Sequence, residues 1–141
     1  MIRNPFVDVM SAMTDSSLPL TQHEFAEWGN PITDWQAAEC IRSYCPVSVL
    51  QADTQSRVSS NPKRLPKIFI SIGLQDTRVC STDTMRFARL VRKRSGKDAS
   101  VLMSVWRNAG HDGPHGDEEQ HQLKATEVAF LVDAVDQTGL N

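Results

Sequence analysis

The chain has 141 residues, of which 40% are hydrophobic and 23% are charged, and its formal net charge is −2 at pH 7. These values are typical of one soluble globular domain and exclude a disordered or fibrous chain. The nearly balanced charge gives no general attraction to nucleic acid or to an anionic membrane surface, and no apolar run reaches the roughly 18 to 20 residues that span a bilayer. We therefore expect no nucleic acid and no membrane among its partners.

The amino-terminal sequence and the cysteines indicate the cellular compartment. The first residues lack the basic-then-apolar run of a secretory signal. Cys40, Cys45 and Cys80 are an odd number at spacings that match no motif, which favours reduced thiols buried as small apolar side chains. Together these features predict a cytoplasmic protein.

The first half of the chain predicts short helices joined by turns. An apolar stretch at residues 5–10 begins abruptly, without a preceding turn or cap. Residues 24–28 fit one or two helical turns that Gly29 would end, and residues 32–44 have the spacing of a longer helix capped by Thr33 or Asp34. Residues 51–66 are rich in Ser, Asn, Gln and Pro and predict a surface loop.

The second half predicts a strand, a helix, a strand and a helix, at about residues 68–72, 82–94, 101–106 and 120–137. Both strands are nearly continuous apolar runs, which is typical of parallel strands covered by helices on both faces. The final helix carries one apolar stripe, formed by Val128, Leu131, Val132 and Val135. Met85, Met103 and the tryptophans are expected in the core. The fold class predicted is α/β, with parallel strands and flanking helices.

An acid and a histidine follow the two predicted strands. Asp76 lies after the first strand and His111 after the second, 35 positions later, close to the length of one βαβ unit. The two loops should therefore open on the same edge of the sheet. Asp before His on successive strand ends is the order of the last two members of an α/β-hydrolase triad. The alternative is that Asp76 caps the following helix and His111 is a polar turn residue.

The nucleophile of such a triad is missing from the sequence. None of the seven glycines is followed two positions later by Ser or Cys, so no nucleophile elbow G-x-S-x-G can be written. His111, His115 and His121 with nearby acids could suggest a metal site, but Gly113 and Pro114 interrupt the helical spacing, and no metal is predicted. The basic residues near the end of the second-half helix at 82–94 predict a solvated face.

Several short segments resemble the C-terminal part of the peptidase domain of the prolyl oligopeptidase family, above all its oligopeptidase B and prolyl endopeptidase-like branch. They follow the family's order and cover almost the whole chain. The most specific are Glu-Trp-Gly-Asn-Pro at 27–31, within a matching segment at 24–31, Gly-Leu-Gln-Asp-Thr-Arg-Val at 73–79 and Ala-Gly-His-Asp-Gly at 109–113. The others are Pro-Phe-Val-Asp-Val at 5–9, Leu-Pro-Leu-Thr at 18–21, Ser-Tyr-Cys-Pro at 43–46 and Ala-Phe-Leu at 129–131.

The resemblance implies specific roles for four residues. Asp76 matches the triad acid, His111 the triad base, and Arg78 the arginine that holds a backbone carbonyl of the substrate. Glu24 matches an acidic position that helps select basic residues in oligopeptidase B, but Ala26 replaces the companion acid, so selectivity for Arg or Lys is in doubt. Glu24 is explained equally well as a favourable charge in the first turns of a short helix. The reaction implied is serine-type peptide hydrolysis, which needs no cofactor.

By the same resemblance, residues 1–141 form a partial peptidase domain of the α/β-hydrolase fold. The family's serine elbow, oxyanion-hole donors and amino-terminal β-propeller would lie upstream of Met1, and residues 5–7 would end the strand that follows the nucleophile helix. We expect no peptidase turnover by this chain alone, and marginal stability from an unpaired sheet edge. The alternative is a non-catalytic truncated product, or an interaction fragment that associates with an intact relative through that exposed edge.

Overall fold

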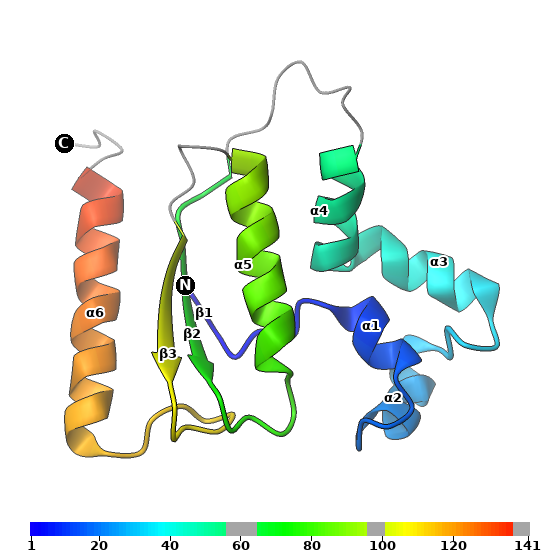
Figure 1. The fold of residues 1–141 in the computed structure, drawn as a ribbon, viewed down its shortest axis with the longest axis horizontal. Coiled ribbons are helices and arrows are strands. Elements are labelled where there is room, and N and C mark those ends of the chain that lie inside the picture. Colours follow the sequence, from blue (N-terminus) through cyan, green and yellow to red (C-terminus); the bar gives the residue numbers. More distant parts are fainter. Residues whose placement is uncertain (56–64, 96–100, 137–141) are drawn as a thin grey trace. The chain divides into compact units, whose positions relative to one another are not determined.

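A computed structural model of the chain describes residues 1–55, 65–95 and 101–136. Contacts divide the chain into two compact units, each assembled from segments that are distant in the sequence (Figure 1). The first unit comprises Met1–Pro5, Leu65–Ser81 and Asp98–Asn141, and the second comprises Phe6–Arg64 and Thr82–Lys97. Each unit is described by itself below.

The first unit contains a parallel three-stranded sheet in the order β1-β2-β3, formed by β1 (Ile2–Arg3), β2 (Ile68–Gly73) and β3 (Val101–Trp106). The central strand β2 is almost fully buried, with Phe69, Ile70 and Ile72 at most 1% exposed. The predicted parallel strands are therefore confirmed. The amino-terminal strand, however, is Ile2–Arg3 and does not include residues 5–7.

The outer strand β3 is less buried than its composition predicts. Leu102 and Val105 are each 45% exposed, so burial on both faces is wrong for this strand. The physical reason is its place at an edge: within the described residues, β3 pairs only with β2. A run of apolar residues does not distinguish a central strand from an edge strand.

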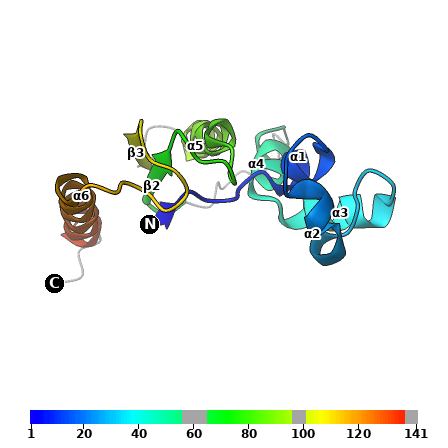
Figure 2. The same ribbon diagram turned by 90° about the horizontal axis from the view of Figure 1, so that it is seen from below.

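Helix α6 (Asp117–Asp136) flanks the sheet of the first unit (Figures 1 and 2). Its Phe130 ring packs against Phe69 of β2 with ring centroids 5.7 Å apart, and Leu123 joins the same cluster. The helix begins three residues before the predicted start, because Asp117, Glu118 and Glu119 supply favourable acidic charge in its first turn. Residue 137, where its end was predicted, lies outside the described residues.

The apolar stripe predicted on the final helix is exposed. Its four members, Val128, Leu131, Val132 and Val135, are 45 to 60% exposed. The face of α6 turned to the sheet instead includes Glu127, which accepts two hydrogen bonds from Arg3 of β1, from Nε at 2.7 Å and from Nη2 at 2.6 Å. This two-bond ion pair ties the short strand β1 to α6.

The second unit is helical, with α1 (Val9–Thr14), α2 (Thr21–Trp28), α3 (Trp35–Tyr44), α4 (Pro46–Gln55) and α5 (Ser81–Ser95). Its core joins residues from the start of the chain to α3 and α4, namely Val7, Val9, Met13, Ile41, Cys45 and Val47. Phe87 and Leu90 of α5 pack against this core. The described residues contain no helix long and apolar enough to cross a membrane.

The predicted stop at Gly29 and the predicted cap at Asp34 are confirmed, whereas α4 has no counterpart among the predicted helices. Gly29 ends α2 with a φ of 82°, and the Asp34 side chain caps α3 by accepting a hydrogen bond from the Gln36 amide at 2.8 Å. The loop predicted for residues 51–66 is wrong at its start, because α4 continues to Gln55. Its centre, residues 56–64, lies outside the described residues.

Asp8, within the apolar stretch at residues 5–10, caps the first helix and pairs with a basic residue of α5. Its side chain caps α1 by accepting a hydrogen bond from the Ser11 amide at 3.2 Å. Its carboxylate also pairs with Arg86 of α5, while Arg94 of α5 pairs with Asp53 of α4. Two of the basic residues of α5 thus form ion pairs within the second unit. The prediction that these basic residues form a solvated face is therefore wrong for Arg86 and Arg94.

Several apolar residues expected in the core are exposed. Trp35 is 73% and Met85 is 41% exposed, and two of the three free cysteines, Cys40 and Cys80, are exposed. Only Cys45 has the buried role expected of all three. Trp35 is the first residue of α3, six positions before the core residue Ile41, so its side chain lies about 120° around the helix from the buried face.

Candidate functional site

Asp76 lies in the turn that follows β2, and one oxygen of its carboxylate is held by hydrogen bonds within that turn. Its Oδ1 accepts hydrogen bonds from the backbone amides of Arg78 at 2.8 Å and Val79 at 3.0 Å. Only 2% of the side chain is exposed. These bonds close the turn itself and not helix α5, which begins at Ser81. The acid therefore has a local structural role, but Oδ2 remains available for a second partner.

That second partner is His111, in the loop that follows β3. Its Nδ1 lies 2.9 Å from Oδ2 of Asp76, across 35 positions of the chain. Gly113, with a φ of 85°, and an isolated bridge between Gly110 and Gly113 turn the loop back toward β2. The two strand ends therefore open on one edge of the sheet, as the sequence predicts.

The electrostatics of the pair determine which nitrogen of the imidazole carries hydrogen. Burial by itself raises the pKa of Asp76, but hydrogen bonds from the Val79 and Arg78 amides and from His111 outweigh it and hold the pKa below its ordinary value of 3.8. The carboxylate is thus ionised at neutral pH and can only accept, so Nδ1 of His111 must donate. The neutral ring then carries a lone pair on Nε2. No residue in the described part of the chain hydrogen-bonds to Nε2, and 33% of the side chain is exposed.

The lowered pKa of Asp76 predicts an acid-sensitive contribution to stability. Because the folded pKa lies below the unfolded one, this carboxylate stabilises the fold above about pH 4 and loses that contribution as the pH falls through the folded pKa. We expect Asp76→Asn to lower the free energy of unfolding by a constant amount above about pH 4. The difference from the parent chain should shrink toward pH 2 in urea titrations. A difference that grew toward acid pH would contradict the assigned direction.

Gly73, the last residue of β2, permits the close approach of the two loops. A Cβ atom there would lie 2.3 Å from the carbonyl oxygen of Ala109 and 2.5 Å from that of Gly110. Backbone bonds join the loops at this point, from Leu74 N to Trp106 O at 2.9 Å and from Gln75 N to Ala109 O at 3.0 Å. Sequence reasoning did not assign Gly73 a role, although a glycine at a strand end is a signal of close backbone approach.

The other two predicted site residues, Arg78 and Glu24, lie outside the hydrogen bond between Asp76 and His111. Arg78 is exposed and lies in the same turn as Asp76, to whose carboxylate its backbone amide donates. Glu24 lies in the first turn of α2 in the second unit. That location agrees with the simple reading of Glu24 as a helix-terminal charge and leaves its suggested substrate role a prediction.

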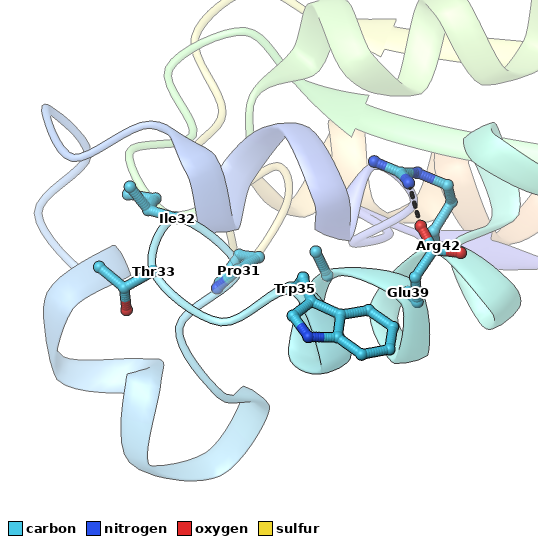
Figure 3. A pocket seen from close by; sticks show the side chains of 7 residues that line it. Pro31, Ile32, Thr33, Trp35, Glu39 and Arg42 are labelled. Atoms are coloured by element: carbon cyan, nitrogen blue, oxygen red, sulfur yellow. Dashed lines mark hydrogen bonds and ion pairs between the residues drawn. The ribbon is translucent and has the colours of Figure 1, made fainter.

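A surface pocket of about 650 Å³ lies in the second unit and has no part in this site. Figure 3 shows the Arg42–Glu39 ion pair among the side chains that line it, which are Pro31, Ile32, Thr33, Trp35, Ala38, Glu39 and Arg42. Within the residues that the structure describes, no group of three or more His, Cys, Asp or Glu side chains could hold a metal ion.

A buried acid hydrogen-bonded to a histidine, each following a parallel strand, is the arrangement expected of the last two triad members in the α/β-hydrolase class. In the comparison with known proteins, residues 1–138 match the prolyl oligopeptidase family. The chain belongs to this family and corresponds to its C-terminal region.

Individual relatives show the same match. The chain is 32% identical to dipeptidyl aminopeptidase BI of Pseudoxanthomonas mexicana over 129 residues, which cover 92% of this chain and 16% of the relative. It is 33% identical to a prolyl endopeptidase-like protein of Gallus gallus, covering 92% and 18%. The structure of oligopeptidase B from Leishmania major superposes with a TM-score of 0.63 at 30% identity, over 77% of this chain and 14% of that one. The chain thus spans about a sixth of the length of the relatives it matches.

Proposed function

We propose that this chain supplies the acid and the base of a serine peptidase of the prolyl oligopeptidase family. The observation that carries the proposal is the 2.9 Å hydrogen bond between Nδ1 of His111 and the buried carboxylate of Asp76. Membership of a peptidase family supports peptides as the substrate class. The partial peptidase domain of residues 1–141 and a cytoplasmic location belong to the same proposal.

The geometry of the pair supports a separate role for each residue. A serine hydroxyl from outside these 141 residues would attack the peptide carbonyl while Nε2 of His111 takes its proton. The imidazolium formed would then give that proton to the leaving amine. Asp76 would hold the ring with Nδ1–H toward itself and stabilise the positive charge. In this role the exposed side chain of Arg78 would donate to a backbone carbonyl of the bound peptide.

Substitution into a relative tests the proposal directly. In a chimera, residues 1–138 replace the matching segment of dipeptidyl aminopeptidase BI, so that the relative supplies the rest of the protein. We expect the folded chimera to hydrolyse peptides and to react with a serine-directed fluorophosphonate probe, while the purified 141-residue chain does neither. A folded chimera without turnover, or labelling of the isolated chain, would refute the proposal. Reading the transcript upstream of Met1 for an in-frame G-x-S-x-G is an independent check.

A second candidate function is association without catalysis. It is favoured by the outer side of β3, which pairs with no other described strand and where Leu102 and Val105 are 45% exposed, and by the exposed stripe of α6. In this role the chain would bind an intact relative through the sheet edge. Sedimentation of the chain mixed with such a relative should then show a complex, and Val105→Lys, a charge on the strand edge, should abolish it.

A further inference from the structure

The side chain of Asn4 lies between the end of β2 and the loop that carries His111. Its Nδ2 donates to the carbonyl oxygens of Gly110, at 3.2 Å, and of His111 itself. Its Oδ1 accepts a hydrogen bond from the Gly73 amide at 2.9 Å. One amide side chain thus bonds to both strand ends from which the acid and the base extend.

The backbone of Asn4 is also held in place. Its φ is +38°, in the left-handed region where Asn is several-fold enriched over other non-glycine residues. Its own amide donates to the carbonyl oxygen of Ser71 at 2.9 Å, and the residue is only 8% exposed. Both hydrogens and the oxygen of the buried amide have partners, so its orientation is determined by the contacts around it.

We propose that Asn4 is a positioning residue that holds the His111 loop against the end of β2 and thereby sets the contact between His111 and Asp76. The inference rests on the proposed function, because it names a residue that serves the acid–base pair. Two of its three side-chain bonds go to the peptide units of Gly110 and His111. The position of the imidazole depends directly on these units, and catalytic side chains must be held to within about 0.5 Å.

Two substitutions separate positioning from general stability. Asn4→Gly tolerates the positive φ and removes all three side-chain bonds. Asn4→Asp keeps the size and the acceptor for the Gly73 amide, but it loses both donors and sets a carboxylate against two carbonyl oxygens. Ser71→Ala is the matched control: Ser71 is 3% exposed and lies in the same sheet. Among the described residues, its hydroxyl accepts a hydrogen bond from Trp106 Nε1 at 3.2 Å and forms none with the His111 loop.

The readout is the tautomer of neutral His111, measured by ¹⁵N NMR of the ring in the 141-residue chain. The parent chain should show hydrogen on Nδ1. In both Asn4 variants the Nδ1–H fraction should fall at least about two-fold, because the hydrogen bond that selects the tautomer is lengthened. The Trp106 signals should still report a folded sheet. Ser71→Ala should lose stability and keep the parent tautomer.

The outcomes are distinguishable. If the folded Asn4→Gly and Asn4→Asp chains keep the parent tautomer, the positioning role is wrong while the Asp76–His111 pair stands. If Ser71→Ala shifts the tautomer as much as the Asn4 variants do, the effect is general destabilisation and the proposal also fails. If the parent chain itself lacks Nδ1–H on His111, the acid–base pair and the proposed function fail together.

Discussion

Gly73→Ala is expected to destabilise the first unit and to displace the His111 loop. The added methyl would lie 2.3 Å from the Ala109 carbonyl oxygen and 2.5 Å from that of Gly110, and both atoms are backbone, so no side chain can simply rotate away. The loop must move outward, which breaks the Gln75–Ala109 backbone bond. We expect a loss of about 2–3 kcal/mol in the free energy of unfolding, measured by urea titration.

Gly110→Ala is the matched control for this change. It adds a methyl to the same loop, beside His111, but the nearest atom would be Gln75 O at an ordinary contact distance of 3.7 Å. We expect the free energy of unfolding to change by less than about 0.5 kcal/mol. Equal losses for the two alanine variants would contradict the close approach at Gly73.

Asp76→Asn should have the largest effect on activity, measured in the chimera with dipeptidyl aminopeptidase BI. An Asn at this position still offers an oxygen to the Arg78 and Val79 amides, so the turn should persist. Its NH₂ group would then donate to Nδ1 of His111, which moves the ring hydrogen to Nε2 and removes the base. We expect kcat to fall about 10⁴-fold, as the same change does in Ser-His-Asp enzymes.

Asp112→Asn controls for charge in this experiment. Asp112 is exposed and is the next residue after His111, so its substitution makes the same charge change beside the site without altering the imidazole contact. It should leave kcat close to that of the parent chimera. A loss as large as that of Asp76→Asn would mean that net charge, and not the tautomer of His111, controls the rate.

The acid–base pair could be predicted from sequence because it depends on chain order. Asp76 and His111 follow consecutive apolar strands, and parallel strands bring such loops to one edge whatever the details of packing. Helix α3 and the end of α2 were predictable for a similar reason, since Asp34 and Gly29 act within a few residues.

Features that depend on distant partners were not predictable. The Asn4 side chain bonds to residues 69 to 107 positions away, and nothing in the local sequence marks it. The exposure of Leu102 and Val105 follows from the place of β3 at the edge of the sheet, which an apolar pattern alone cannot show. Helix α4 was missed because the polar composition after residue 50 resembles that of a loop.

The tautomer of His111 in the parent chain and in Asp76→Asn tests the central claim most directly. With ¹⁵N-labelled protein at a pH where the ring is neutral, the parent should carry hydrogen on Nδ1 and a bare Nε2, because the buried carboxylate can only accept. In Asp76→Asn the hydrogen should move to Nε2. A parent chain with hydrogen on Nε2, or an unchanged tautomer in the variant, would show that Asp76 does not orient His111.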